Sequence, residues 1–219
     1  MNITHAVSEV VEGDKLNAIF SRQKELMTKY HDIEARSGLM QTEDCPVNLD
    51  DKRGQARIKD FAWRVTEEVG EALDALYVHN DFVHFQEELI DGLHFLTELS
   101  VLADFNCNKL AEITKCEADD DILDKTFEFF KTFNDKDANE LNALITQLIL
   151  HLGMTCNCLK NKPWKQTNMI TDKPAFYDNL TKVWLSYLKL LFKYMTPDEV
   201  TDIYLKKSQV NKFRQRSNY

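Results

Sequence analysis

Apolar residues recur every three or four positions in two neighbouring stretches, and this period restricts the fold more than any other feature. In residues 55–78 the apolar stripe is formed by Val65, Val69, Ala72, Leu73 and Leu76. In residues 82–104 it is formed by Phe82, Phe85, Leu89, Leu93 and Leu96. Such spacing predicts two amphipathic α-helices. The short connection VHNDF makes them antiparallel neighbours.

Helical periods also dominate the rest of the chain, which has 219 residues with only 6 Gly and 4 Pro. This scarcity disfavours a turn-rich β fold. We expect further helices over 14–36, 137–160 and 175–195, and a last helix that begins at Thr196 with Pro197 and the capping-box acid Glu199. The prediction is an all-α helical bundle that forms a single domain over 1–219.

Carboxylates flank both stripes at a spacing of three residues. Glu68 and Glu71 lie on the first of the two helices, and Glu88 and Asp91 lie on the second. Because each residue turns the helix by about 100°, these side chains border the packed seam, and antiparallel packing brings all four toward one cleft. Oxygen ligands at this density suit Mg²⁺ or Mn²⁺. The alternative is that they are solvated surface acids.

Charge and cysteine content restrict the partners and the compartment. The net charge of −9 argues against binding nucleic acid or an anionic membrane through the global field. An odd number of cysteines, 5, and an N-terminus without the pattern of a signal peptide indicate free thiols in a cytoplasmic, reducing compartment. Cys156 and Cys158 resemble half of a zinc site, but a matching second pair is missing from the sequence.

The acidic pattern resembles the E-x-x-E…E-x-x-D signature of the all-α, MazG-like nucleoside triphosphate pyrophosphohydrolases. "DGLHFLTEL", which contains His94, is similar to the version in dimeric dUTPases and the phage dCTPase/dUTPase group. The C-terminal "YLKKSQVNKFRQRSNY" resembles the closing motif of that group, with Lys207, Asn211, Arg214 and Asn218-Tyr219 at the motif positions. Gln23 matches the family's Gln-x-x-Leu, and Trp63 stands near a family Trp.

This resemblance implies an enzyme that hydrolyses dUTP to dUMP and pyrophosphate, limiting uracil in DNA and supplying dUMP. It implies two or three Mg²⁺ ions, replaceable by Mn²⁺, held by Glu68, Glu71, Glu88 and Asp91, with Glu68 or Glu71 activating the water. It also implies a homodimer and a variable helical insert over 105–174. The implied substrate-binding residues are Gln23, Trp63, His94, Lys207, Asn211 and Arg214.

Several alternatives stay open at the level of the sequence. Met27 stands where the family places Asn, so dCTP or a broader set of deoxynucleotides is a second candidate substrate. Trp63 is equally compatible with plain core packing, His94 with a buried histidine that supports a ligand, and the basic C-terminal helix with a solvated helix end. A non-enzymatic helical interaction protein is the third hypothesis.

Overall fold

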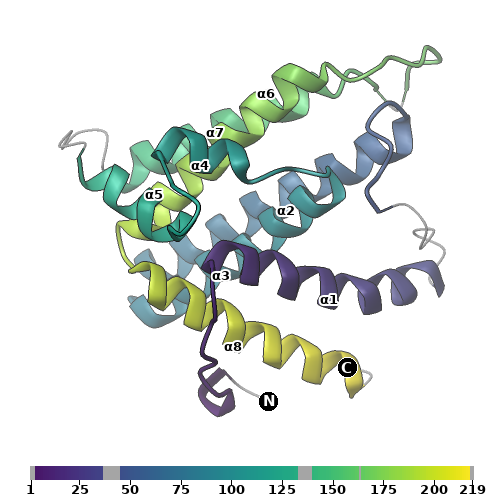
Figure 1. The fold of residues 1–219 in the computed structure, drawn as a ribbon. Coiled ribbons are helices and arrows are strands. Elements are labelled where there is room, and N and C mark those ends of the chain that lie inside the picture. Colours follow the sequence, from purple (N-terminus) through teal and green to yellow (C-terminus); the bar gives the residue numbers. More distant parts are fainter. Residues whose placement is uncertain (1–2, 37–44, 133–139, 163, 218–219) are drawn as a thin grey trace.

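The computed structural model describes residues 3–36, 45–132, 140–162 and 164–217, with the side chains of 31–35 left undescribed. Over these residues the chain is helical and contains no β-strand, which confirms the all-α prediction (Figure 1). The closing Asn218-Tyr219 pair lies outside the described residues. After the short 3₁₀-helix Ile3–His5 come α1 (Lys15–Arg36), α2 (Lys52–Tyr77), α3 (Phe82–Leu102), α4 (Asn108–Thr114), α5 (Ile122–Lys131), α6 (Leu141–Cys158), α7 (Lys173–Phe192) and α8 (Pro197–Arg216).

The predicted antiparallel hairpin of α2 and α3 is the centre of the molecule. Each helix begins at an aspartate: the side chain of Asp51 accepts from the backbone N–H of Gly54 at 2.6 Å, and Asp81 accepts from that of His84 at 3.0 Å. This N-cap starts α2 three residues before the predicted position 55. Between the helices, Asn80 takes a left-handed φ of 53°, which asparagine tolerates well.

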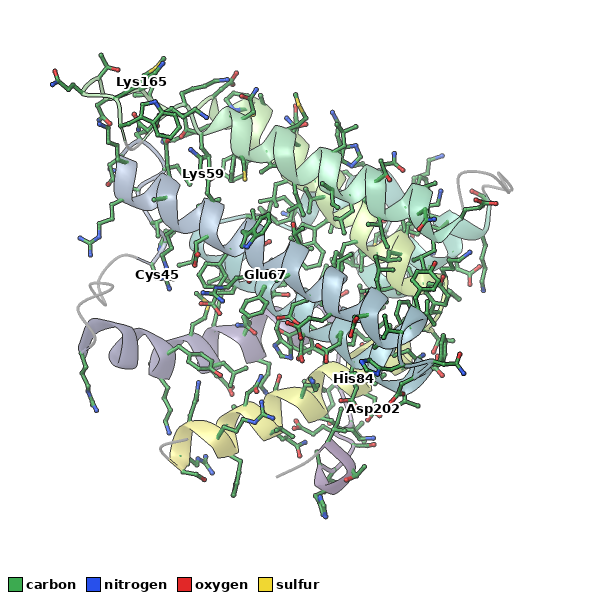
Figure 2. All side chains as sticks on the ribbon, turned by 180° about the vertical axis from the view of Figure 1, so that it is seen from behind. Cys45, Lys59, Glu67, His84, Lys165 and Asp202 are labelled. Carbon is green, nitrogen blue, oxygen red and sulfur yellow. The ribbon has the colours of Figure 1, made fainter. Side chains whose placement is uncertain are left out.

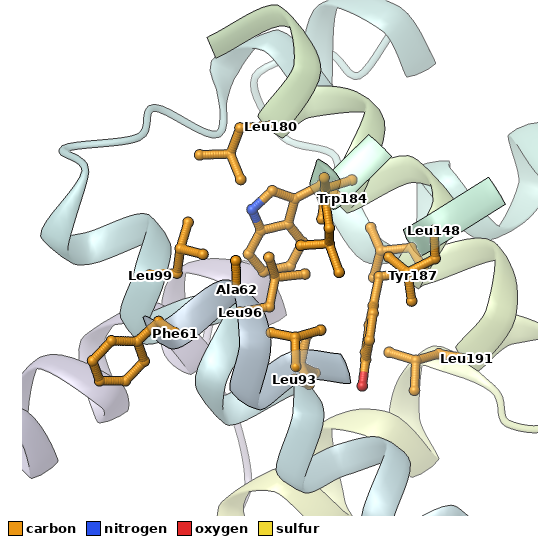
Figure 3. Close-up of a cluster of buried hydrophobic side chains, with 14 of the residues drawn as sticks. Phe61, Ala62, Leu93, Leu96, Leu99, Leu148, Leu180, Trp184, Tyr187 and Leu191 are labelled. Carbon is orange, nitrogen blue, oxygen red and sulfur yellow. The ribbon is translucent and has the colours of Figure 1, made fainter. Parts of the chain in front are cut away.

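A second pair, α6 and α7, covers one face of the hairpin and completes the core. Trp184 and Tyr187 of α7 are fully buried among leucines from α3, α6 and α7 (Figure 3). The indole of Trp184 stacks on Phe20 of α1 and donates to the hydroxyl of Ser100 at 2.9 Å. The aromatic segment 175–195 is therefore largely core of its own chain.

The terminal helices α1 and α8 pack together on another side of the hairpin (Figure 1). Lys212 of α8 pairs with Glu25 of α1 at 2.5 Å, and Gln215 donates to the Leu26 carbonyl at 3.3 Å. The capping box predicted at Thr196 and Glu199 is present at the start of α8. This pairing places the basic C-terminal motif opposite the acids of α2 and α3.

In the described part of the chain, no helix combines the length and the apolar character needed to cross a bilayer.

Candidate active site

Three of the four predicted carboxylates come together between α2 and α3. Glu68, Glu71 and Glu88 each offer an oxygen, and these oxygens lie within 4.8 Å of one another. Glu88 is buried, with 7% of its surface exposed, and its Oε1 lies 3.1 Å from Nε2 of His84. Figure 2 views the molecule from behind Figure 1, with Glu67 labelled on α2 and His84 on α3.

A glycine allows the two helices to approach closely beside these acids. A Cβ atom added to Gly92 would lie 3.3 Å from Cβ of Glu68 and only 2.1 Å from the hydroxyl of Tyr187. That hydroxyl is buried and donates to the Leu89 carbonyl at 2.7 Å. Asp91 therefore stands directly before the glycine that allows α2 and α7 to approach α3 closely.

The electrostatics of the cluster favour a bound cation. Burial, the nearby charge of Asp91, a hydrogen bond with Glu88 and the charge of Glu71 together raise the pKa of Glu68 to about 8. A carboxyl group that is hard to ionise because of its acidic neighbours gains a partner when a divalent cation binds. Three clustered carboxylate oxygens are ligands that Mg²⁺ prefers, so the residues fit the predicted ion.

Asp91, the fourth predicted ligand, is engaged by a lysine. Nζ of Lys207 lies 2.5 Å from Oδ2 of Asp91 and 3.7 Å from Glu87. Burial raises the pKa of Asp91 to about 6, although Lys207 acts in the opposite direction. The structure thus places Asp91 beside the cluster of three and joins it to the C-terminal motif through Lys207.

A cleft of about 380 Å³ opens next to the acids, between α1, α2, α3 and α8. Its predicted members are Gln23, Glu68, Asp91, His94, Asn211 and Arg214, which lie far apart in the sequence. The remaining lining residues were not predicted: Leu26, Tyr30, Asp60, Phe61, Arg64, Phe95 and Glu98. Two basic and two amide side chains therefore share the cleft with acids and aromatic rings.

The aromatic wall of the cleft consists of Tyr30, Phe61 and Phe95. The rings of Phe61 and Phe95 are 6.1 Å apart between centroids, and flat rings of this kind can flank a nucleobase. Trp63, by contrast, is 62% exposed and does not line this cleft, and its indole donates to Glu67 at 2.9 Å. Met27 is buried in the core and does not line the cleft either.

A hydrogen-bonded group of side chains forms the buried end of the cleft. Nε2 of Gln23 donates to Glu98 at 2.9 Å, and Oε1 of Gln23 accepts from the Tyr204 hydroxyl at 2.8 Å. The same Oε1 lies 3.0 Å from Nδ1 of His94, whose ring stacks on Tyr204 at 3.8 Å. Burial lowers the pKa of His94 to about 3, with a further contribution from Lys207 in the same direction, so the ring is neutral.

Cys156 and Cys158 lie two residues apart near the end of α6, outside the acidic cluster. Burial raises the pKa of Cys156 to about 11, which keeps its sulfur protonated. Among the described residues, the acidic cluster of α2 and α3 is the group of His, Cys, Asp and Glu side chains placed to share an ion.

These features define an all-helical enzyme class in which an acidic cluster on a helical hairpin adjoins a cleft with aromatic and cationic walls. The chain belongs to the dUTPase family, because the model of that family, described as dUTPase, matches residues 15–219. It is a dUTP diphosphatase, which confirms the predicted reaction class and decides against a non-enzymatic interaction protein. Neither the curated proteins nor the solved structures gave a match.

Proposed function

We propose that the chain hydrolyses dUTP to dUMP and pyrophosphate with Mg²⁺ held by Glu68, Glu71, Glu88 and Asp91. The observation that supports this most directly is the cluster of carboxylate oxygens within 4.8 Å, next to a cleft large enough for a nucleotide. When bound, the cations supply positive charge to the phosphate oxygens and lower the pKa of a coordinated water. This reaction would limit uracil in DNA by removing dUTP and would supply dUMP.

The attacking water needs a carboxylate that both orients it and accepts its proton. Glu68 and Glu71 are the candidates, and Glu68 is favoured because it belongs to the cluster and also lines the cleft. Its raised pKa of about 8 describes the ion-free cluster, and positive charge in the site lowers it toward the ionised state that a base requires.

The C-terminal helix supplies the groups that hold the nucleotide. Arg214 lines the cleft, and its guanidinium can form forked hydrogen bonds to phosphate oxygens. Nζ of Lys207 lies 2.5 Å from Asp91, so a phosphate bound beside Asp91 would meet the positive charge of this lysine. Asn211 offers both a donor and an acceptor to a pyrimidine edge or a deoxyribose hydroxyl. Tyr30, Phe61 and Phe95 replace Trp63 as our proposed partners of the base.

Pyrophosphate release from each deoxynucleoside triphosphate, with Mg²⁺, Mn²⁺ or a chelator, tests this proposal. We expect dUTP to be the best substrate and the chelator to abolish turnover. Glu71→Gln and Asp91→Asn should each lower kcat by about 10²-fold or more, as expected when a charged group is removed from such a site. The control is Glu112→Gln, an exposed acid of α4, which should behave like wild type.

The same panel decides between dUTP and the second candidate, dCTP or a broader set. Met27, which motivates that alternative, lies in the core with 2% exposure, so base selection falls to the residues that line the cleft. Equal turnover of dUTP and dCTP would favour the broader enzyme. Full activity of Asp91→Asn in the presence of Mg²⁺ would contradict the proposed role of that carboxylate.

We also propose that the chain forms a homodimer through α6. This helix has nine exposed residues and not one Asp, Glu, Lys or Arg, although charged residues make up 29% of the chain. Ala143, Gln147, Leu150, Met154 and Asn157 follow a spacing of four and three residues, the period of helix pairing. Two copies that each carry −9 can meet with least repulsion through an uncharged face.

The segment 105–174 is proposed to be an insert that belongs to the same single domain. It contains α4, α5 and α6, and Leu148 and Leu152 of α6 join the core that Trp184 occupies. An insert of this kind completes the core and presents the uncharged face on its outer side.

A further inference from the structure

The hydroxyl group of Tyr187 fills the place of a missing side chain on α3. Tyr187 belongs to α7, and its hydroxyl lies so close to Gly92 that an added Cβ atom would overlap it. Gly92 stands directly after Asp91 and one helical turn beyond Glu88, so these three positions share one face of α3. The hydroxyl therefore enters the face of α3 that carries both proposed metal ligands of this helix.

Glu68 of α2 approaches the same point from the other helix of the hairpin. Its Cβ atom lies 3.3 Å from the position that Cβ of Gly92 would take. Burial and the nearby charges of Glu68 and Asp91 raise the pKa of Tyr187, so the hydroxyl keeps its proton. A neutral hydroxyl group thus stands in the contact between α2 and α3, beside the acidic cluster.

From this place the hydroxyl forms a hydrogen bond to the backbone of α3. It donates to the Leu89 carbonyl at 2.7 Å, and a carbonyl can accept a second bond besides the one within its helix. Leu89 directly follows Glu88 and stands two residues before Asp91. Tyr187 is fully buried in the core (Figure 3), so water does not supply this bond in its place. The bond connects α7 to the turn of α3 from which both acids project.

This connection matters because the acids of the hairpin repel one another until an ion binds. Three of their oxygens lie within 4.8 Å of one another, and repulsion between them favours separation of α2 and α3. Mg²⁺ is bound at about 2.0–2.1 Å with near-ideal octahedral geometry, whereas Ca²⁺ accepts longer distances and irregular geometry. A site that is held at a fixed spacing before the ion arrives therefore favours Mg²⁺ over Ca²⁺.

We propose that Tyr187 is a positioning residue of the metal site. Its bond to the backbone of α3 holds Glu88 and Asp91 at the spacing from the acids of α2 that a small divalent ion requires. Tyr187 touches neither the ion nor the nucleotide in this scheme and acts through α3. The inference rests on the proposed function in one respect, because it takes the acidic cluster to bind Mg²⁺.

Tyr187→Phe tests the inference, because it removes the hydroxyl and keeps the ring in the core. We expect the dissociation constant for Mn²⁺ to rise about tenfold to a hundredfold, the range found when an outer partner of a metal site is removed. The electron paramagnetic resonance signal of free Mn²⁺ measures this binding in the full-length protein without nucleotide. Competition with Mg²⁺ and Ca²⁺ gives the other two affinities, and we expect Mg²⁺ to lose more affinity than Ca²⁺.

Ser100→Ala is the matched control, because it removes a buried hydrogen bond between the same two helices. The indole of Trp184 on α7 donates to the Ser100 hydroxyl on α3 at 2.9 Å, and Ser100 is fully buried. This bond lies about three helical turns along α3 from Leu89. Both variants should lower the Tm, since each loses a buried hydrogen bond. Only Tyr187→Phe should weaken the binding of Mn²⁺.

The two variants separate a positioning role from a general loss of packing. An unchanged Mn²⁺ affinity in Tyr187→Phe overturns the inference, and so does an equal loss of affinity in Ser100→Ala. Equal losses for Mg²⁺ and Ca²⁺ in Tyr187→Phe also overturn it, because the spacing of the ligands is then not what changed. If wild type binds Mn²⁺ and hydrolyses dUTP, these outcomes leave the proposed function intact. If wild type binds neither Mn²⁺ nor Mg²⁺, the proposed function fails and the inference fails with it.

Two unnatural residues in place of Tyr187 keep the test decisive if Tyr187→Phe does not fold. The amino group of 4-aminophenylalanine can donate to the Leu89 carbonyl, whereas 4-methylphenylalanine has a similar volume and no donor. We expect an Mn²⁺ affinity close to that of wild type with the amino group and a loss of about tenfold or more with the methyl group. Equal affinities in these two proteins overturn the inference, since the two side chains differ mainly in the hydrogen bond.

Discussion

Gly92 illustrates at the scale of one residue how the acidic motif depends on packing. An alanine there would place Cβ 2.1 Å from the buried hydroxyl of Tyr187, which would have to move and break its 2.7 Å bond to the Leu89 carbonyl. We predict that Gly92→Ala lowers the free energy of unfolding by about 2–3 kcal/mol through overpacking and the lost hydrogen bond. Urea denaturation measures this value.

Gly70 of α2 provides the matched control. A Cβ at Gly70 meets no atom within 4 Å, so Gly70→Ala should stabilise the chain by about 0.5–1 kcal/mol through helix propensity. If Gly92→Ala is as stable as Gly70→Ala, the close contact between α3 and Tyr187 is not present in solution.

Glu68 gives a prediction about pH. Its pKa is raised from 4.5 to about 8 in the folded chain, so between these values the folded state binds more protons than the unfolded state. The contribution of Glu68 to stability is therefore greatest at low pH and is lost as pH rises from about 4.5 to about 8. In a chelator, we expect the Tm to fall across this window, as scanning calorimetry would record.

Glu68→Gln should flatten that dependence, because the amide does not titrate, and should raise the Tm at pH 8 relative to wild type. Asp91 contributes in the same direction, with its pKa raised to about 6, so a smaller slope remains in the variant. An unchanged slope in Glu68→Gln would mean that another group dominates the pH dependence.

The sequence predicted the proximity of residues that are joined by one helical turn or by one hairpin. Glu68, Glu71 and Glu88 were predicted from helix periodicity and the spacing of one hairpin, and the structure brings them together. Glu98 escaped notice because its partner Gln23 is 75 residues away, and Tyr204 is 181 residues from the same side chain. No local period reports such pairings, and only the packing of α1 and α8 on α3 creates them.

At the scale of elements, local signals predicted the helices and missed only their ends and faces. The signal at Thr196 was complete, and the structure shows both halves of its capping box. The start of α2 was missed because the cap is Asp51, which lies four residues before the expected beginning of the helix. The aromatic composition of 175–195 could not show whether this segment is buried within its own chain or against a second chain, because both kinds of burial require the same residue types.

The cap of α8 leads to a prediction that belongs to the whole helix. Thr196→Ala removes the acceptor of the Glu199 N–H and one partner of the Glu199 carboxylate. We expect a loss of about 1 kcal/mol in unfolding free energy. Because α8 carries Lys207, Asn211 and Arg214, fraying of the helix should also raise KM for dUTP. Denaturation and steady-state kinetics measure the two effects.

Thr201 on the same helix is the control for this variant. Its hydroxyl is buried but bonds to the Pro197 carbonyl within the helix and caps nothing, so Thr201→Val keeps the shape of the side chain and the start of the helix. If KM for dUTP rises equally in both variants, the loss of the helix cap is not the cause of the rise.

At the scale of the molecule, the proposed homodimer depends on the uncharged face of α6. Leu150 and Met154 are 60% and 45% exposed, and Gly153 between them has open space at its Cβ position. The connection that follows α6 adds exposed apolar side chains at Trp164 and Ile170. An antiparallel pair of α6 helices from two copies would bury this face around a two-fold axis near its middle.

We predict that Leu150→Lys combined with Met154→Lys converts the dimer to a monomer, since four lysines would face one another across the axis without an acidic partner on α6. Analytical ultracentrifugation across a concentration series should show half the mass of wild type. The fold should survive, because both side chains are exposed in the single chain, and circular dichroism checks this.

Val83 is the control that makes the result specific to α6. It is 64% exposed at the start of α3, next to other exposed apolar residues at the hairpin turn, Tyr77, Val78 and Phe82. Val83→Lys should leave the dimer intact if α6 forms the interface. If Val83→Lys dissociates the dimer and the α6 double variant does not, the chains meet at the hairpin turn, and the absence of charge on α6 needs a different explanation.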